Sequence, residues 1–251
     1  MYLNLGGVVM DATIAKLDKV VKTYNKHHVL NEISMSINKG ELLGLIGPSG
    51  SGKTTTIKCL LGMEKIDSGS AEIFAHKMPN RKVLNRLGYM GQTDALYENL
   101  TAYENLEFYG RLSGLKGNVL KDNIEKHIVL VNLEQALNKK VAQFSGGMKR
   151  RLSLAITLLA EPELIILDEP TVGIDPKLRQ QIWQQFKQMT KDGKSVVITT
   201  HVMDEAERCD KVGLIVDGRI FAIDTPTNLK QRFNVDTIEA VFIKAEEVRQ
   251  S

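Results

Sequence analysis

The chain has 251 residues, 43% of them hydrophobic and 25% charged, and its formal net charge at neutral pH is +3. This composition is typical of a globular protein with a stable core, and it excludes a disordered chain. A net charge this small argues against nucleic acid as a partner, because nucleic-acid-binding domains usually carry a dense basic stripe. No apolar run approaches the roughly 18 residues that a membrane-spanning helix needs. If the protein works at a membrane, another chain must cross it.

The first 11 residues fit no element of a globular fold, and we expect them to form a disordered N-terminal extension. They lack the basic start and apolar core of a signal peptide. The Gly6-Gly7 pair ahead of Met10 is what a purine-rich ribosome-binding site would give if it were translated. We therefore hypothesise that translation starts at Met10.

The next segments predict an antiparallel strand, a buried strand and a helix. Ile33, Met35 and Ile37 alternate with polar residues, as in a strand with one buried face. Leu42–Ile46 is nearly all apolar, as in a strand covered on both faces. It runs into a glycine-rich turn that is followed by Thr54–Leu61, which has helical character.

The glycine-rich turn matches the Walker A pattern of phosphate-binding loops. Phosphate binding needs successive backbone N–H groups that point into one concavity, and glycine leaves them unobstructed. The helix that follows adds its positive N-terminal end. A chance glycine-rich loop is the alternative, but the preceding strand and following helix are the context that the motif requires. The motif reads Gly47, Pro48, Ser49, Gly50, Ser51, Gly52, Lys53 and Thr54; Lys53 would contact the β- and γ-phosphates and Thr54 would offer a hydroxyl to Mg²⁺.

A second glycine pair lies at the start of a helix. The stretch Asn99–Lys140 is polar and helical, and the motif Phe144–Met148 then stands directly before a strong helix at Arg150–Leu159. Ser145 is a good N-cap, and the glycines after it expose backbone donors at a helix N-terminus. Taken alone, the motif fits a capped helix and nothing more. In this context it predicts a second anion site, formed by Ser145, Gly146, Gly147 and Met148.

An apolar strand at Leu164–Leu167 ends in two carboxylates. Ligands of open α/β sheets bind at the C-terminal ends of the strands. Asp168 therefore fits a place in the coordination shell of a metal, and Glu169 fits a general base for an attacking water. The alternative is a strand that ends in a solvated acidic turn, which the Walker A motif upstream makes the weaker interpretation.

The C-terminal part predicts a helix, a buried strand and a hairpin. Asp175-Pro176 is typical of a helix N-cap followed by proline, and Gly193 ends the helical region. Val196–Thr199 has the composition of a buried strand, and Asp217-Gly218 is a favoured hairpin turn. Strands that alternate with helices predict an α/β fold with a mainly parallel sheet, here with an antiparallel β layer and an inserted helical subdomain.

The order of these motifs resembles that of ATP-binding-cassette (ABC) ATPases, whose signature motif usually reads Leu-Ser-Gly-Gly-Gln. The resemblance covers about residues 12–233 and implies the P-loop NTPase cassette fold, with a helical subdomain at about 93–160. Residues 234–251 would form a short C-terminal tail.

The resemblance implies roles for further positions, one at a time. Tyr24 lies where the family has an aromatic residue that stacks on adenine, although an ordinary strand tyrosine fits too. Gln92 resembles the glutamine that touches Mg²⁺ and signals to the transmembrane partner, but Gly91 stands where proline is frequent. Asp175 would lie in a loop that crosses the dimer interface, and it could equally be only a helix cap.

His201 is similar to the switch histidine at the γ-phosphate, and would act in catalysis with Glu169 and Lys53. Thr55 completes the implied ATP-binding set, and Thr54, Gln92 and Asp168 the implied Mg²⁺ set.

In this family one cassette binds ATP on its Walker A face, and the signature of a second cassette closes over the γ-phosphate. The resemblance therefore implies an ATPase with ATP and Mg²⁺ as cofactors, and a homo- or heterodimer. It also implies a transmembrane permease as partner and a peripheral position on the cytoplasmic face of the membrane. The substrate would be chosen by the permease.

Softer features indicate a subfamily. The variant signature Phe144–Met148, the run Leu100–Leu106 and the end Thr237–Phe242 resemble drug-resistance-type exporter ATPases of bacteria. A soluble ABC ATPase that acts on DNA, ribosomes or iron–sulphur assembly, an importer ATPase, and a nucleotide switch without turnover remain the alternatives.

Overall fold

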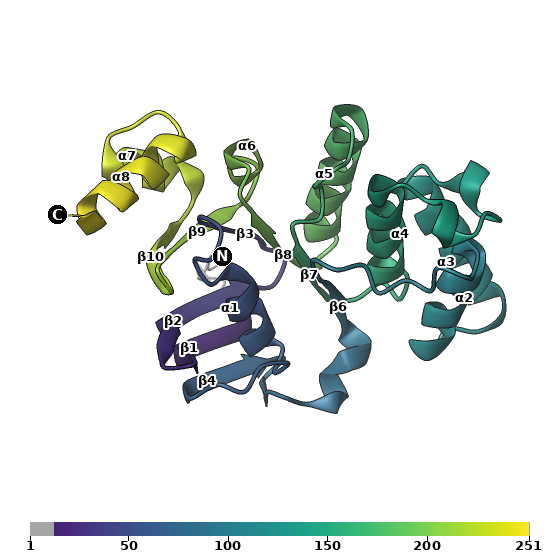
Figure 1. Ribbon diagram of the computed structural model, residues 1–251, viewed down its shortest axis with the longest axis horizontal. Coiled ribbons are helices and arrows are strands. Elements are labelled where there is room, and N and C mark those ends of the chain that lie inside the picture. Colours follow the sequence, from purple (N-terminus) through teal and green to yellow (C-terminus); the bar gives the residue numbers. More distant parts are fainter. Residues whose placement is uncertain (1–12, 251) are drawn as a thin grey trace, which may run out of the picture.

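In the computed structural model, residues 13–250 are described, so the predictions for residues 1–11 and Met10 lie outside the described part. Two sheets share one body (Figure 1). A four-stranded antiparallel sheet has the order β2-β1-β4-β5, and a six-stranded sheet has the order β10-β9-β3-β8-β7-β6. In the larger sheet, β9, β3, β8, β7 and β6 run parallel and only β10 pairs antiparallel. The predicted fold class is confirmed.

The strand bounds agree with the sequence patterns. The buried runs at Leu42–Ile46 and Leu164–Leu167 form β3 and β7, and the Asp217-Gly218 turn joins β9 to β10. The strands are β1 (Thr13–Tyr24), β2 (His27–Asn38), β3 (Leu42–Ile46), β4 (Ser68–Ile73), β5 (His76–Lys77), β6 (Leu87–Met90), β7 (Leu164–Asp168), β8 (Ser195–Thr200), β9 (Lys211–Val216) and β10 (Arg219–Asp224).

Two helices begin earlier than the sequence pattern predicted, because their caps lie at the glycine-rich motifs. Helix α1 starts at Lys53 and helix α4 starts at Gly146. The helices are α1 (Lys53–Leu60), α2 (Ala102–Leu112), α3 (Gly117–Leu130), α4 (Gly146–Leu158), α5 (Pro176–Lys191), α6 (Met203–Ala206), α7 (Pro226–Phe233) and α8 (Ile238–Gln250), with short 3₁₀ turns η1 (Arg81–Arg86), η2 (Glu134–Ala136) and η3 (Val141–Gln143).

The parallel strands divide the core between their two faces. Because side chains alternate along a strand, Leu42 and Ile46 of β3 join one buried cluster and Leu43 and Leu45 join the other. The first cluster contains residues of α2 to α8, and the second lies between the large sheet, α1 and the antiparallel sheet. Both faces of the parallel strands are therefore covered, as their continuous apolar runs predicted.

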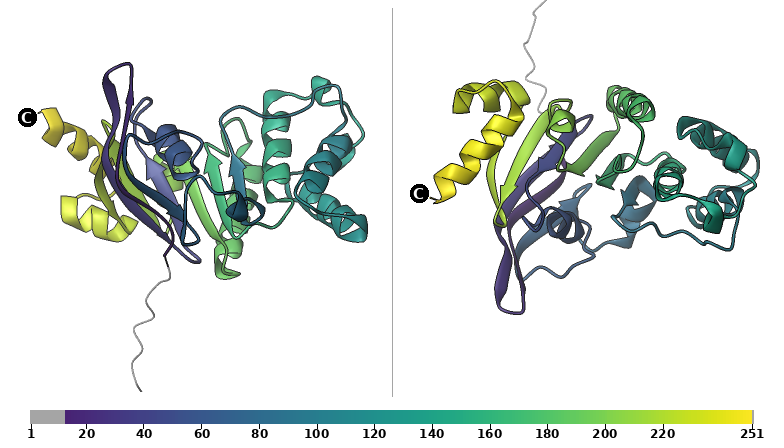
Figure 2. Two further views of the ribbon diagram at one scale, coloured as in Figure 1. Left: turned by 90° about the horizontal axis from the view of Figure 1, so that it is seen from below. Right: turned by 45° about the horizontal axis from the view of Figure 1, so that its top comes forward.

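Two peripheral lobes flank the sheets. Helices α2, α3 and α4 form a helical lobe beyond the β6 edge, well separated from the antiparallel sheet (Figures 1 and 2). Helices α7 and α8 pack together at the other end, near β9 and β10. The segment 234–251, predicted as a short tail, contains α8, whose Ile238, Val241 and Ala245 are fully buried. No helix in the described part of the chain is long and apolar enough to cross a bilayer.

Candidate nucleotide-binding site

The loop between β3 and α1 has a backbone that only glycine suits at several positions. Gly50 and Gly52 have φ angles of 79° and 104°, which side-chain-bearing residues rarely adopt. At Gly47 a Cβ atom would lie 2.2 Å from the carbonyl oxygen of Ile215. The crest of the loop at Ser49 and Gly50 is exposed. The predicted phosphate loop thus has the backbone freedom and the open crest that a phosphate cradle needs.

Lys53, the first residue of α1, is 7% exposed. Its Nζ donates hydrogen bonds to the carbonyl oxygens of Gly47 at 2.7 Å and Pro48 at 2.9 Å. Burial lowers the pKa of Lys53, and the negative charges of Glu169 and Asp168 oppose that shift. The ammonium group therefore lies beside the backbone of the predicted phosphate loop.

Three residues predicted to hold a metal are joined by hydrogen bonds. Thr54 Oγ1 donates to Asp168 Oδ2 at 2.8 Å, and Gln92 Nε2 donates to Thr54 Oγ1 at 3.1 Å. They come from the start of α1, the end of β7 and the loop after β6. Asp168 is fully buried, and Gln92 is exposed. The set brings a hydroxyl and a carboxylate, which are oxygen ligands of the kind that Mg²⁺ prefers, together with the side-chain amide of Gln92.

The turn after β7 is held in place by Thr199 of β8, a residue that no sequence motif indicates. Thr199 Oγ1 donates to Asp168 Oδ1, and the backbone N–H of Glu169 points to Thr199 O and Oγ1, each at 3.1 Å. Glu169 has a φ of 53°, in the left-handed region. This conformation is costly for a residue with a side chain, and residues held in it cluster at functional sites.

Glu169 faces His201 across the end of the sheet. His201 Nδ1 lies 3.1 Å from Glu169 Oε1, and the side chains are 56% and 24% exposed, respectively. The structure therefore brings together the two residues predicted to act as general base and switch histidine. Both side chains reach solvent, so a water molecule and a phosphate could meet them.

A buried carboxylate connects the segments that follow these residues. Glu205 of α6 is 3% exposed and accepts hydrogen bonds from Thr171 Oγ1 and, at 2.6 Å, from Thr200 Oγ1. Thr171 follows Glu169 by two positions, and Thr200 precedes His201. Glu205 thus fixes both loops, but no local sequence signal distinguishes it from other acidic residues on a short helix.

The β9–β10 turn supports the phosphate loop from behind. The N–H of Gly218 donates to Ser51 O at 3.0 Å, and Gly218 O accepts from the N–H of Asn31 at 2.7 Å. The turn glycine has a φ of 68°, and a Cβ atom there would lie 2.2 Å from Val29 O. The sequence pattern predicts only a hairpin turn at Gly218, and the structure adds this contact with the Walker A loop.

Tyr24 lies at the end of β1 and is 38% exposed. Lys22 Nζ lies 4.6 Å from the centroid of the tyrosine ring, a cation–π contact. Burial, followed by the effect of Glu64, raises the pKa of Tyr24 to about 12, so the phenol is neutral at physiological pH. The ring is exposed enough to stack on a planar ligand.

The residues of the predicted signature motif lie at the start of α4, away from the phosphate loop. Ser145 caps α4 by accepting a hydrogen bond from the N–H of Met148 at 3.3 Å, and both Ser145 and Gly146 are exposed. Gly147 packs closely on the loop before α5, since a Cβ atom there would lie 2.7 Å from Gly173 O. Asp175 in that loop caps α5 through the N–H of Leu178 at 3.0 Å.

Apart from Tyr24 at the end of β1, the predicted site residues therefore fall into two groups. One group surrounds the start of α1 and the ends of β7 and β8. The other lies at the start of α4, and β7 and β6 stand between α1 and α4 (Figure 1). The first group comprises Gly47, Pro48, Ser49, Gly50, Ser51, Gly52, Lys53, Thr54, Thr55, Gln92, Asp168, Glu169 and His201, and the second comprises Ser145, Gly146, Gly147, Met148 and, in the adjoining loop, Asp175.

The fold and the first group of residues define a P-loop nucleotide-binding protein. The sequence profile of the ABC transporter family matches residues 30–172. The linearmycin resistance ATP-binding protein LnrL of Bacillus subtilis is 40% identical over 224 residues, which cover 88% of this chain and 72% of LnrL. The chain belongs to the ABC transporter family and is an ABC ATPase.

Further relatives and solved structures agree with the assignment to the ABC transporter family. The probable multidrug ABC transporter ATP-binding protein YbhF of Escherichia coli is 35% identical over 92% of this chain and 41% of YbhF. The Nod factor export ATP-binding protein I of Burkholderia orbicola is 38% identical over 90% of this chain and 77% of that protein. A solved ATP-binding subunit of an ABC transporter superposes with a TM-score of 0.87 at 26% identity, covering 93% of this chain and all of that chain. The dimeric cassette MJ0796 bound to ADP and Pi superposes with a TM-score of 0.78 at 28% identity, covering 84% of this chain and 98% of that chain.

Proposed function

We propose that this ABC ATPase powers a separate membrane permease, an exporter, from the cytoplasmic face of the membrane, and that it hydrolyses Mg²⁺-bound ATP between two cassettes. The observation that carries the proposal is the 3.1 Å approach of His201 to Glu169 beside the hydrogen-bonded set of Thr54, Asp168 and Gln92. A binding module without turnover would not need a carboxylate and a histidine at this point.

The residues present fit ATP and Mg²⁺. Ser51 Oγ is buried in the phosphate loop without a hydrogen-bond partner in the described part of the chain, and a phosphate oxygen would satisfy it. Lys53 and the loop amides would hold the phosphates, and Tyr24 would stack on the base. Thr54, Asp168 and Gln92 would hold Mg²⁺, which neutralises charge on the phosphates when bound.

In the reaction, Glu169 would accept the proton of the attacking water as general base. The water oxygen would form a bond to the γ-phosphorus, and the bond from that phosphorus to the β–γ bridging oxygen would break, so that ADP and phosphate are the products. His201 lies beside Glu169 and would contact the γ-phosphate of a bound ATP. Thr199 and Glu205 keep both loops in place, because they bond to the backbone or side chains next to Glu169 and His201.

Two features support a site completed by a second chain. The exposed signature residues Ser145 and Gly146 are on a different helix from the Walker A loop, and β7 and β6 stand between them in the same chain. A helix N-terminus with free donors favours an anion. The signature of one cassette would therefore bind the γ-phosphate held by another, and the loop at Asp175 would lie at the interface.

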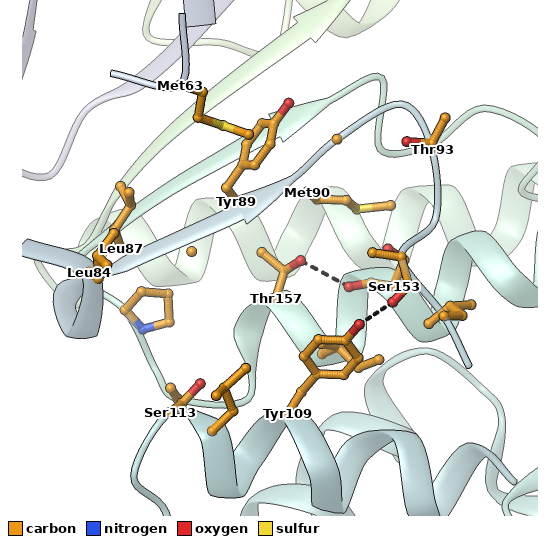
Figure 3. A pocket seen from close by; sticks show the side chains of 18 of the residues that line it. Met63, Leu84, Leu87, Tyr89, Met90, Thr93, Tyr109, Ser113, Ser153 and Thr157 are labelled. Carbon is orange, nitrogen blue, oxygen red and sulfur yellow. Dashed lines mark hydrogen bonds between the residues drawn. The ribbon is translucent and has the colours of Figure 1, made fainter. Parts of the chain in front are cut away.

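The proposal of a membrane partner is supported by a groove of about 910 Å³. It runs from Thr54 and Gln92 to the helical lobe, and Figure 3 shows Ser153 and Thr157 of α4 between Tyr109 of α2 and the strand that carries Tyr89 and Met90. A permease segment bound there would touch Gln92, so its movement and the metal site would be linked. Its lining is mainly apolar, including Met63, Leu84, Leu87, Leu112 and Ile156. The names of LnrL, YbhF and the Nod factor protein support an exporter.

The test uses Glu169→Gln, which keeps size and hydrogen-bonding reach but removes the base. General-base loss costs about 10²–10⁴ in rate. ATP should bind and remain unhydrolysed, and the trapped nucleotide should shift the monomer–dimer equilibrium by mass action. We expect the variant with ATP and Mg²⁺ to sediment largely as a dimer, whereas the wild type with ADP sediments largely as a monomer.

Adding Ser145→Arg should break that dimer without preventing ATP binding by the monomer, because the new side chain places bulk and charge at the signature. Gln188→Arg is the control, since it adds the same side chain at an exposed position near the C-terminal end of α5, at the opposite end of that helix from the Asp175 loop. A Glu169→Gln protein that hydrolyses ATP at the wild-type rate would refute the catalytic assignment. One that binds ATP yet stays monomeric would count against a site completed by an identical chain.

A further inference from the structure

Arg150 of α4 is a buried cation that the function described so far does not use. It is 7% exposed and lies one turn inside the helix that Ser145 caps. A guanidinium buried this deeply is costly unless its five N–H donors find acceptors. Its partners belong to two catalytic loops rather than to its own helix.

The first loop is the one that carries Gln92. Arg150 Nη1 donates to Gly91 O at 2.6 Å and lies 3.4 Å from Gln92 O, with Asp94 Oδ1 at 3.5 Å. Gly91 has no side chain, so its backbone has wide conformational freedom of its own. The contact to its carbonyl group therefore restrains the backbone next to Gln92.

The second loop is the turn that carries the general base. Arg150 Nη2 donates to Asp168 O and to Glu169 O, the latter at 2.8 Å, and Nε lies 3.3 Å from Glu169 O. The N–H of Glu169 is held by Thr199. Both sides of this left-handed residue are thus fixed, and Arg150 supplies the contact on the carbonyl side.

We propose that Arg150 is a positioning residue that holds the Gln92 loop and the Asp168–Glu169 turn in register with the signature helix. The planar fork of the guanidinium suits this task, because it can serve both loops at once, whereas a lysine ammonium is a single point. The inference rests on the proposed function of Glu169 as general base. It adds that the helix whose N-terminus serves the neighbouring half-site also orients the base of its own chain.

Arg151, the next residue, is a matched control. Its Nη1 donates to Val131 O and Asn132 O, both at 2.9 Å, and Asn132 is also left-handed, with a φ of 58°. Arg151 therefore makes the same kind of contact from the same helix, but to the end of α3. Loss of either arginine removes carbonyl contacts, and only loss of Arg150 frees the catalytic loops.

The experiment compares Arg150→Met, Arg150→Lys and Arg151→Met in the full chain. Misplacement of a catalytic group by about 1 Å costs about 10²-fold in rate, so we expect kcat for ATP hydrolysis to fall about 10²-fold in Arg150→Met. The Kd for ATP, measured by calorimetry on the Glu169→Gln background, should change less than about threefold, because Lys53 and the loop amides are untouched. Arg150→Lys should lose nearly as much activity, and Arg151→Met should keep a wild-type kcat.

Circular dichroism and urea unfolding establish that each variant is folded at the assay temperature. If Arg150→Met does not fold, the kcat of Arg150→Lys alone tests the inference. A folded Arg150→Lys or Arg150→Met with wild-type kcat overturns the inference, as does an equal loss of kcat in Arg151→Met. A wild-type chain that hydrolyses no ATP would instead refute the proposed function.

Discussion

The hydroxyl group of Thr54 and the carboxylate of Asp168 are joined by a 2.8 Å hydrogen bond, although the residues stand 114 positions apart in the chain. Parallel pairing of β3 and β7 with β8 between them brings the start of α1 to the end of β7. Gln92 adds its amide to the same point because β6 pairs with β7. The proposed metal site is thus a consequence of the strand order.

Thr54→Val tests this site, because valine has nearly the same shape but lacks the hydroxyl. A hydrogen bond to a charged group contributes about 1.5–3 kcal/mol, so the Mg²⁺ concentration for half-maximal ATPase activity should rise about tenfold or more. Thr54→Ser keeps the hydroxyl and should behave like the wild type. EDTA should abolish activity in every variant. A Thr54→Val protein with an unchanged Mg²⁺ titration would remove Thr54 from the metal site.

Much of the fold follows from local sequence patterns. The alternation at Ile33, Met35 and Ile37 predicted a strand with one buried face, and all three side chains are buried in β2. Asp175 and Ser145 were predicted as helix caps, and both accept the expected backbone hydrogen bonds. These signals are local, because a period or a cap depends on residues a few positions apart.

Contacts between distant segments left no such signal. Thr199 holds the Asp168–Glu169 turn, but in the sequence it is one more β-branched residue in a buried strand. Gly218 supports the Walker A loop because β9 pairs with β3, and that pairing is a property of the whole sheet. Residue type and spacing alone could not reveal either role.

Gly218→Ala should destabilise the protein and weaken ATP binding. The left-handed backbone costs a residue with a side chain about 1–2 kcal/mol, and the new Cβ atom would lie 2.2 Å from Val29 O. We expect the free energy of unfolding in urea to fall by at least about 2 kcal/mol. The Kd for ATP should rise because the turn also holds Ser51 O.

Gly114→Ala is the control for this prediction. Gly114 has a φ of 87°, but nothing lies within 4 Å of the position a Cβ atom would take. The free energy of unfolding of this variant should fall only by the cost of the left-handed backbone, about 1–2 kcal/mol. Its affinity for ATP should equal that of the wild type. Equal ATP affinities in the two variants would show that the β9–β10 turn does not shape the phosphate loop.

Tyr24→Ala should weaken binding of ATP and GTP to a similar extent, because stacking tolerates any base. Stacking contributes about 1–3 kcal/mol per base, which corresponds to about 5- to 150-fold in Kd. Tyr24→Phe keeps the ring that Lys22 contacts and should bind nearly as well as the wild type. Calorimetry with both nucleotides is the measurement. If the phenylalanine variant binds as poorly as the alanine variant, the hydroxyl and not the ring carries the interaction.

His127 makes the stability of the helical lobe depend on pH. Its side chain is 3% exposed, and Nδ1 lies 2.8 Å from the carbonyl oxygen of Asn123. Burial lowers its pKa below the ordinary value of 6.5, and Lys126 adds to the shift. Below an unfolded pKa of about 6.5 the unfolded chain therefore binds more protons than the folded one, and the free energy of unfolding falls as pH decreases.

His127→Gln removes the titrating group, so this variant should lose less stability on acidification than the wild type does. The slope from one such group cannot exceed about 1.4 kcal/mol per pH unit. We expect the wild type to lose more free energy of unfolding in urea than the variant between about pH 7.5 and about pH 5.5. His76→Gln is the matched control, since His76 Nδ1 also lies near a carbonyl oxygen, that of Phe74 at 2.7 Å, but its side chain is only partly buried. The prediction is wrong if His127→Gln and His76→Gln show the same pH dependence as the wild type, because a neutral buried histidine must be protonated on unfolding in acid.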